Sequence, residues 1–115
     1  MNIDTIRILG IDYGIEFVAP NIGESVSLPA GECLTTKTTI RINTEANSGQ
    51  HMKAVLLHEI IEALNYRLEL QLEHPQITQL ESALFAVLND NPNLVKYLFK
   101  RDPTVDPSFM RKFSV

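Results

Sequence analysis

The residues best suited to chemistry lie in one short stretch, Leu57-His58-Glu59-Ile60-Ile61-Glu62. In an α-helix, residues four positions apart lie one turn above each other, so His58 and Glu62 point the same way, with Glu59 roughly 100° round the axis. A metal ion needs two ligands on one face, and hydrolysis needs a carboxylate beside them to take a proton from water. The spacing therefore predicts His58 and Glu62 as metal ligands and Glu59 as the general base.

The stretch reads HEIIE, whereas the zinc peptidase helix reads HExxH, so a glutamate stands in place of the second histidine. A carboxylate oxygen can still coordinate zinc. A chance match remains open, because a histidine and a glutamate at this spacing can also form a simple surface hydrogen bond.

Ahead of this stretch, the apolar residues follow a period of two. Residues 5 to 19 alternate in a way that predicts two strands, with Gly10 and residues 12 to 14 marking a turn or bulge between them. Residues 20 to 31 are rich in Asn, Gly, Ser and Pro and are interpreted as a loop. Alternation resumes over residues 35 to 43, which predicts a third strand. Cys33 is interpreted as a small strand residue.

From about residue 45 the period changes to 3.6, which indicates helices. The first helix is expected from a cap at Asn47 to about Leu70, and it is apolar round most of its circumference. Two further helices are expected at Pro75 to Asp90 and at Asn91-Pro92 to about Lys100. Together these elements predict an α+β fold: one domain over residues 1–100 and an extended tail over 101–115.

Glu81 lies inside the apolar arc of the second helix rather than opposite it. A buried carboxylate without a partner is costly, so we expect Glu81 to meet a cation, a hydrogen-bond donor or a metal. Arg41 and Arg67 are alternative partners. His74, at the start of this helix, could supply a ligand nitrogen or could act only as a cap.

Several segments resemble the small phage- and prophage-encoded metallopeptidase-like proteins related to the ImmA/IrrE family. The resemblance covers about residues 5 to 95 and rests on the three runs Ile40-Arg41-Ile42-Asn43, Leu56 to Ile61 and Leu80 to Leu88 with Asp90-Asn91-Pro92. It implies a minimal zincin-like domain, a small sheet followed by two packed helices, that acts on a protein or peptide. Carried over by position, it makes His58 the first ligand, Glu59 the general base and Glu81 the third ligand.

Position 62 departs from that family pattern. A shell of one histidine and two glutamates would carry more negative charge than two histidines and one glutamate, so the ion would be a weaker Lewis acid. Manganese or iron would then compete better with zinc. His74 could compensate as a nitrogen ligand. Two functions therefore remain open: a metal-dependent peptidase, and a catalytically inactive zincin-like binding or structural module, which would hold no metal if the site is degenerate.

Composition limits the remaining function classes. The chain has 115 residues, of which 44% are apolar and 21% charged, within the range of globular domains. A formal net charge of −4 argues against nucleic acid as a partner. No apolar run approaches the roughly 20 residues that span a membrane, and the first residues lack the pattern of a signal peptide. We therefore expect a cytoplasmic protein, encoded by a phage or prophage according to the resemblance.

Overall fold

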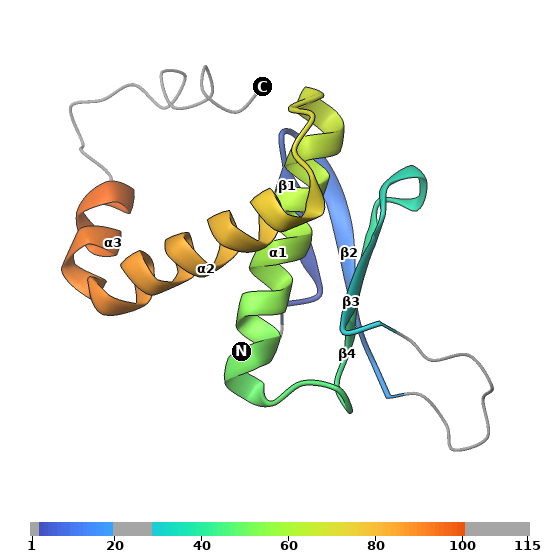
Figure 1. Ribbon diagram of the computed structural model, residues 1–115, viewed down its shortest axis with the longest axis horizontal. Coiled ribbons are helices and arrows are strands. Elements are labelled where there is room, and N and C mark those ends of the chain that lie inside the picture. Colours follow the sequence, from blue (N-terminus) through green and yellow to red (C-terminus); the bar gives the residue numbers. More distant parts are fainter. Residues whose placement is uncertain (1–2, 20–28, 101–115) are drawn as a thin grey trace.

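In the part of the chain that the structure describes, the fold is an α+β domain of one sheet and three α-helices (Figure 1). The structure, a computed structural model, describes residues 3–19 and 29–100. Most of the loop expected at residues 20 to 31, and the whole tail expected at 101–115, lie outside the described residues. The elements are β1 (Thr5–Ile8), β2 (Ile11–Val18), β3 (Gly31–Leu34), a 3-10 turn η1 (Thr35–Lys37), β4 (Thr39–Asn43), α1 (Gly49–Leu68), α2 (His74–Asp90) and α3 (Pro92–Phe99).

The sheet has the strand order β1-β2-β4-β3. Strands β1 and β2 form a hairpin closed by Leu9 and Gly10, both with positive φ, which suits the right-handed twist of the two strands. Asp12, Tyr13 and Gly14 belong to β2 itself, so the turn is at Gly10 and not at residues 12 to 14. Strand β4 pairs in parallel with β2 and antiparallel with β3, which leaves β3 at an edge.

The third strand expected at residues 35 to 43 is in fact a short 3-10 turn followed by β4. A fourth strand, β3, occupies Gly31–Leu34, where the sequence showed no alternation. All four residues of β3 are half-buried, so the strand has no clean inner and outer face. This even burial removes the period-two pattern by which the other strands were recognised.

Helix α1 packs along one face of the sheet (Figure 1). Its N-cap is Ser48, whose hydroxyl accepts a hydrogen bond from the His51 amide at 3.4 Å, and not Asn47 as expected. The Asn47 side chain instead donates to the carbonyls of Ala30 and Asn43, at 2.9 and 2.7 Å. Asn47 therefore ties the start of α1 to the chain at the ends of β3 and β4.

The core lies between α1 and the sheet. Inward-facing sheet residues and two residues of α1 form it, namely Ile8, Tyr13, Ile15, Ile40, Ile42, Val55 and Ala63. Glu59 and Ile61 of α1 are buried as well, and the other residues from 54 to 65 are half-buried, whereas Leu68 near the end of the helix is exposed. The helix thus has one face on the sheet and another on α2, and its C-terminal end is open to solvent.

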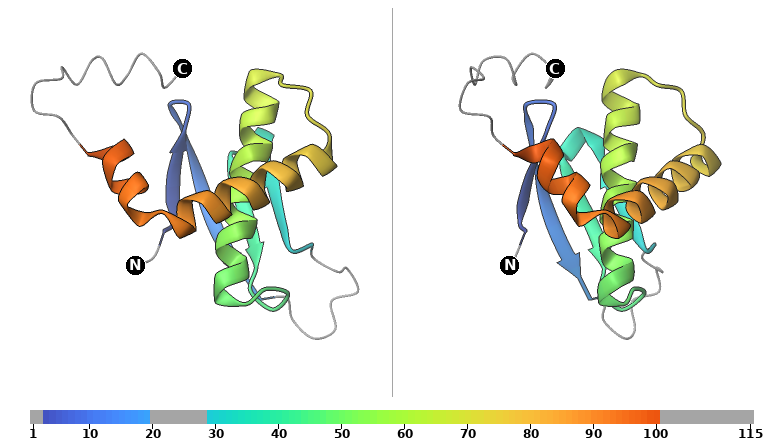
Figure 2. Two further views of the ribbon diagram at one scale, coloured as in Figure 1. Left: turned by 60° about the vertical axis from the view of Figure 1, so that its left-hand side comes forward. Right: turned by 90° about the vertical axis from the view of Figure 1, so that its left-hand side faces the viewer.

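Helix α2 crosses α1 on the side away from the sheet and continues past it to α3 (Figure 2). Ile77 is its one buried residue. On the apolar face predicted for this helix, Phe85 is half-buried. Most of that face and much of the apolar side of α3 are exposed, at Leu80, Leu84, Val87, Leu88, Leu94, Tyr97, Leu98 and Phe99. Within residues 3–19 and 29–100, no helix combines the length and apolar character needed to cross a membrane.

Candidate metal centre

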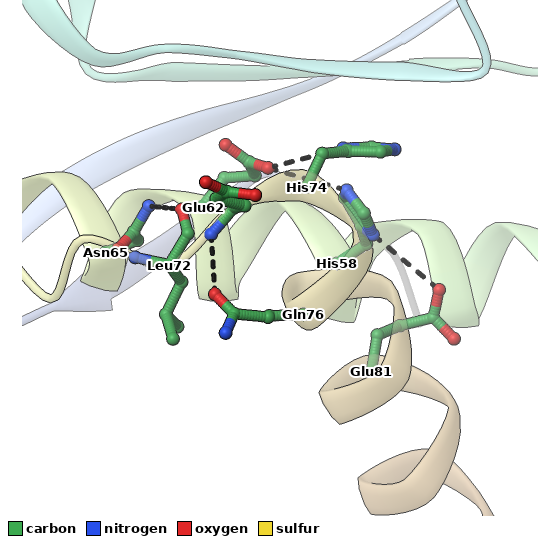
Figure 3. Close-up of polar contacts among 8 residues, drawn as sticks. His58, Glu62, Asn65, Leu72, His74, Gln76 and Glu81 are labelled. Atoms are coloured by element: carbon green, nitrogen blue, oxygen red, sulfur yellow. Dashed lines mark hydrogen bonds and ion pairs between the residues drawn. The ribbon is translucent and has the colours of Figure 1, made fainter.

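His58 and Glu62 lie one turn apart on α1, as the helical spacing requires, and both side chains face the start of α2 (Figure 3). The His58 Nε2 atom is 3.6 Å from Glu62 Oε1. The same carboxylate oxygen is 3.8 Å from His74 Nδ1. The two imidazole rings are 5.1 Å apart between centroids. Glu62 therefore stands between two histidines that come from different helices.

His74 reaches this position because the connection between α1 and α2 turns back sharply. Helix α1 ends at Leu68; its C-cap residue Glu69 has a left-handed conformation, and Gln71 is left-handed as well. Neither residue is glycine, so each conformation costs on the order of 1 kcal/mol. The Asn65 side chain offsets this cost by donating to the Leu72 carbonyl at 3.1 Å and accepting from the Leu72 amide at 2.9 Å.

Helix α2 is capped by Glu73 and not by His74. The Glu73 side chain accepts from the Gln76 amide, and the Gln76 side chain accepts from the Glu73 amide at 2.8 Å. This capping box satisfies the first turn of the helix without an imidazole. The His74 side chain is left 75% exposed, with a nitrogen close to Glu62.

The donor groups fit a small divalent ion. One ligand atom each from His58, Glu62 and His74 lies within 4.8 Å of the other two. Donors held at about 2.0–2.2 Å from a tetrahedral zinc ion stand roughly 3.3–3.6 Å apart, so a small inward movement of the side chains would bring all three within reach of one ion. Two imidazoles and one carboxylate are also donor types that zinc accepts.

Glu81 meets His58 from the opposite side of the imidazole ring (Figure 3). Its Oε1 atom is 3.7 Å from His58 Nδ1, and its side chain is largely buried. Neither arginine considered as a partner pairs with it: Arg41 contacts Glu16 and Glu32, and Arg67 donates to Tyr13 and to the Thr35 carbonyl. Glu81 is thus brought to the site, but it lies outside the compact group of His58, Glu62 and His74.

Glu59 is the most deeply placed acidic residue of the site region, with only 6% of its surface exposed. It faces the edge strand β3 at Gly31. A Cβ atom at position 31 would lie 3.1 Å from Glu59 Oε2 and 2.5 Å from Val55 Cγ1. Glycine at this position therefore makes room for the Glu59 side chain between α1 and β3. In the sequence, Gly31 had been interpreted only as the end of a loop.

Burial, and after it the negative charges of the Glu62 and Glu32 carboxylates, together raise the pKa of Glu59 from 4.5 to about 7. The pKa of the Cys33 thiol is raised to about 11, chiefly by burial and then by Glu59 and Glu62. Cys33 therefore stays a thiol near neutral pH, which agrees with its interpretation as a strand residue. Electrostatically, Glu59 and Glu62 lie close enough to influence each other.

Replacing Gly31 with alanine should lower the free energy of unfolding by about 1–3 kcal/mol, because the new methyl group collides with Val55 and crowds Glu59. Urea denaturation of parent and variant measures the difference. Gly49→Ala is the matched control, since a Cβ atom there meets nothing within 4 Å. Equal stability of the Gly31→Ala variant and the parent would mean that β3 and α1 do not approach this closely.

Comparison of the chain with protein-family models, with curated proteins and with solved structures finds no match in any of the three.

Proposed function

We propose that the protein binds one divalent metal ion, zinc by preference, through His58, Glu62 and His74, and that it hydrolyses peptide bonds at this site. The observation that carries the proposal is the grouping of these three donors within 4.8 Å of one another. The donors come from two helices joined by a connection that Asn65 fixes at Leu72.

The donor types support zinc over harder ions. Glu62 stands where the HExxH motif has its second histidine. His74, at the start of α2, supplies an imidazole in place of that histidine. The resulting set of two histidines and one glutamate is one that catalytic zinc sites use. This set has one carboxylate and not two. The extra negative charge that would favour manganese or iron over zinc is therefore not expected.

When bound, such an ion would act as a Lewis acid towards the substrate carbonyl and make water in the site more acidic. Glu59 follows His58 directly on α1; its side chain packs against Gly31 of β3, and the charge of Glu62 contributes to its raised pKa, so a turn of the side chain away from Gly31 is part of the proposal. In the proposed reaction Glu59 takes a proton from the attacking water and passes it to the departing amine nitrogen. The sequence resemblance supports a protein or peptide substrate in the cytoplasm of a bacterial host that carries a phage or prophage.

A second candidate is a zincin-like module that binds a partner without catalysis. The observation that favours it is the exposed apolar side chains along α2 and α3, which include Tyr97 at 78% and Phe99 at 75% exposure. Large exposed apolar surfaces are typical of interaction sites. The two candidates differ in whether the protein cleaves a peptide bond when the metal is present.

Elemental analysis of protein purified without chelator or added metal tests the metal proposal, and about one zinc ion per chain is expected. The same preparation is then assayed for cleavage of an unfolded protein, with chelator-treated protein as the control. If the chain holds no metal, even after zinc, manganese or iron is supplied, the proposed site is wrong. Metal binding without cleavage would select the non-catalytic module.

A further inference from the structure

His58 has a carboxylate on each side of its imidazole ring. Glu62 approaches Nε2 at 3.6 Å, and Glu81 approaches Nδ1 at 3.7 Å (Figure 3). The two ring nitrogens point in diverging directions, and in the neutral ring one of them carries the proton while the other has a free electron pair. An ion bound to one ring nitrogen of His58 is therefore close to only one of the two carboxylates, and the other carboxylate faces the opposite nitrogen.

The positions of the other donors decide which nitrogen faces the ion. Glu62, which approaches Nε2, also contacts His74, and these residues form the compact group with His58. An ion in this group would use Nε2. Glu81 then lies behind the ring, where the remaining N–H of a metal-binding histidine commonly meets a carboxylate.

We propose that Glu81 is a positioning residue that accepts the Nδ1–H hydrogen bond of His58 and so keeps the Nε2 electron pair free to bind the ion, and that Glu81 is not itself a ligand. The part of this inference that concerns the ion rests on the proposed function. The part that concerns the imidazole does not, because Glu81 should select the same tautomer of His58 in the metal-free protein.

The surroundings of Glu81 support this role. Its side chain is 17% exposed and that of His58 is 14% exposed, so water screens the contact only weakly. Its second oxygen, Oε2, accepts a hydrogen bond from the Ser82 hydroxyl at 3.3 Å, which leaves Oε1 directed at His58. Ile77, only 1% exposed and one helical turn before Glu81, fixes this part of α2 in place.

Cobalt titration of the full chain tests the inference on Glu81→Ala and on Glu81→Gln, with Gln79→Ala, an exposed position of α2, as the control. We expect Glu81→Ala to bind Co²⁺ about 10- to 100-fold more weakly than the parent. At saturation, the visible absorption bands of Co²⁺ should match those of the parent, because the ligand set is the same. Glu81→Gln should lose less affinity, since its amide oxygen can still accept from Nδ1–H.

Glu62→Gln provides the contrast, because it changes a ligand and should shift the Co²⁺ bands. If Glu81→Ala and Glu81→Gln shift the bands in the same way, Glu81 is a ligand and the inference is wrong. Far-ultraviolet circular dichroism of each variant shows whether α2 is still folded. The glutamine variant keeps the side-chain size and thus keeps the test valid if the alanine variant unfolds.

Nitrogen NMR of the metal-free protein gives a second and independent result. At a pH well above the titration range of imidazole, His58 of the parent should be mainly the Nδ1–H tautomer, and Glu81→Ala should shift it towards the Nε2–H tautomer. An unchanged tautomer would overturn the inference. If the parent binds no cobalt at all, the proposed metal function fails, and the tautomer still decides the role of Glu81.

Discussion

Replacing Glu59 with glutamine should make the metal-free protein more stable at alkaline pH and should strongly lower the hydrolytic activity of the zinc-loaded protein. The pKa of Glu59 is raised from 4.5 to about 7 in the folded protein. Well below pH 4.5 the carboxyl is neutral in both the folded and the unfolded states, so it does not alter stability. As the pH rises to 7, the unfolded state loses its proton first, and the free energy of unfolding falls.

Above pH 7 this loss is complete, and we expect it to be about 2 kcal/mol after allowing for water that still reaches the carboxyl. Glutamine has no proton to lose. The free energy of unfolding of Glu59→Gln should therefore exceed that of the parent by this amount above pH 7, and the two should be equal at acidic pH. Urea denaturation across this pH range, with chelator present, measures the difference. The control is Glu69→Gln, at an exposed position, which should show no such gain. Equal stability of Glu59→Gln and the parent above pH 7 would mean that the carboxyl is well hydrated.

Activity of the zinc-loaded Glu59→Gln variant should fall about 100- to 10,000-fold, because glutamine cannot accept the proton of the attacking water. Zinc affinity should change much less, since Glu59 is not among the grouped donors. Glu59 would thus lower the stability of the fold while it serves the reaction, a trade-off that is common at functional sites. Full activity of the glutamine variant would remove Glu59 from the mechanism.

Replacing His74 with alanine should weaken zinc binding roughly 100- to 1,000-fold, about 3–4 kcal/mol, if each donor carries an equal share of the free energy of a structural zinc site. The fold should hardly change, because the side chain is 75% exposed. Calorimetric titration of the variant with zinc measures the affinity. His51→Ala is the control, since His51 is an exposed histidine of α1 outside the donor group.

If His74→Ala binds zinc as tightly as the parent, the third ligand lies elsewhere, and Glu81 becomes the leading alternative because of its contact with His58. The thermal stability of the two histidine variants provides a second measurement. Zinc should raise the melting temperature of His51→Ala as it does that of the parent, and should raise that of His74→Ala much less.

The parts of the site that could be predicted from the sequence are those fixed by local helical geometry. His58 and Glu62 face the same way because they are four residues apart in a helix. The place of His74 could not be decided in this way. It depends on two left-handed residues that are not glycine and on hydrogen bonds from Asn65 to Leu72, and neither leaves a periodic pattern.

In the fold, too, features set by local periodicity could be predicted, and features set by packing between distant elements could not. The change of period near residue 45 separated the strands from the helices, and the α+β class is confirmed. The short strand β3 was missed because its four residues are evenly half-buried. The apolar face of α2 correctly indicated a helix, but periodicity does not show what covers that face, and most of it is exposed. The helical spacing predicted Glu59 only as a base about 100° round the axis from His58, and it did not indicate that the side chain packs against Gly31 in the interior.

The hydrogen bonds between Asn65 and Leu72 fix the conformation of the connection, so the number of residues between Glu62 and His74 determines where the imidazole lies. Insertion or deletion of one residue between Glu62 and His74 would move the imidazole away from the carboxylate, whereas most substitutions at the exposed positions between them would not. A diverged protein with the same centre should therefore keep a spaced pattern of His-Glu-x-x-Glu, then asparagine three residues after the second glutamate and histidine nine residues after that. Such a pattern would distinguish this arrangement from chance occurrences of HExxE.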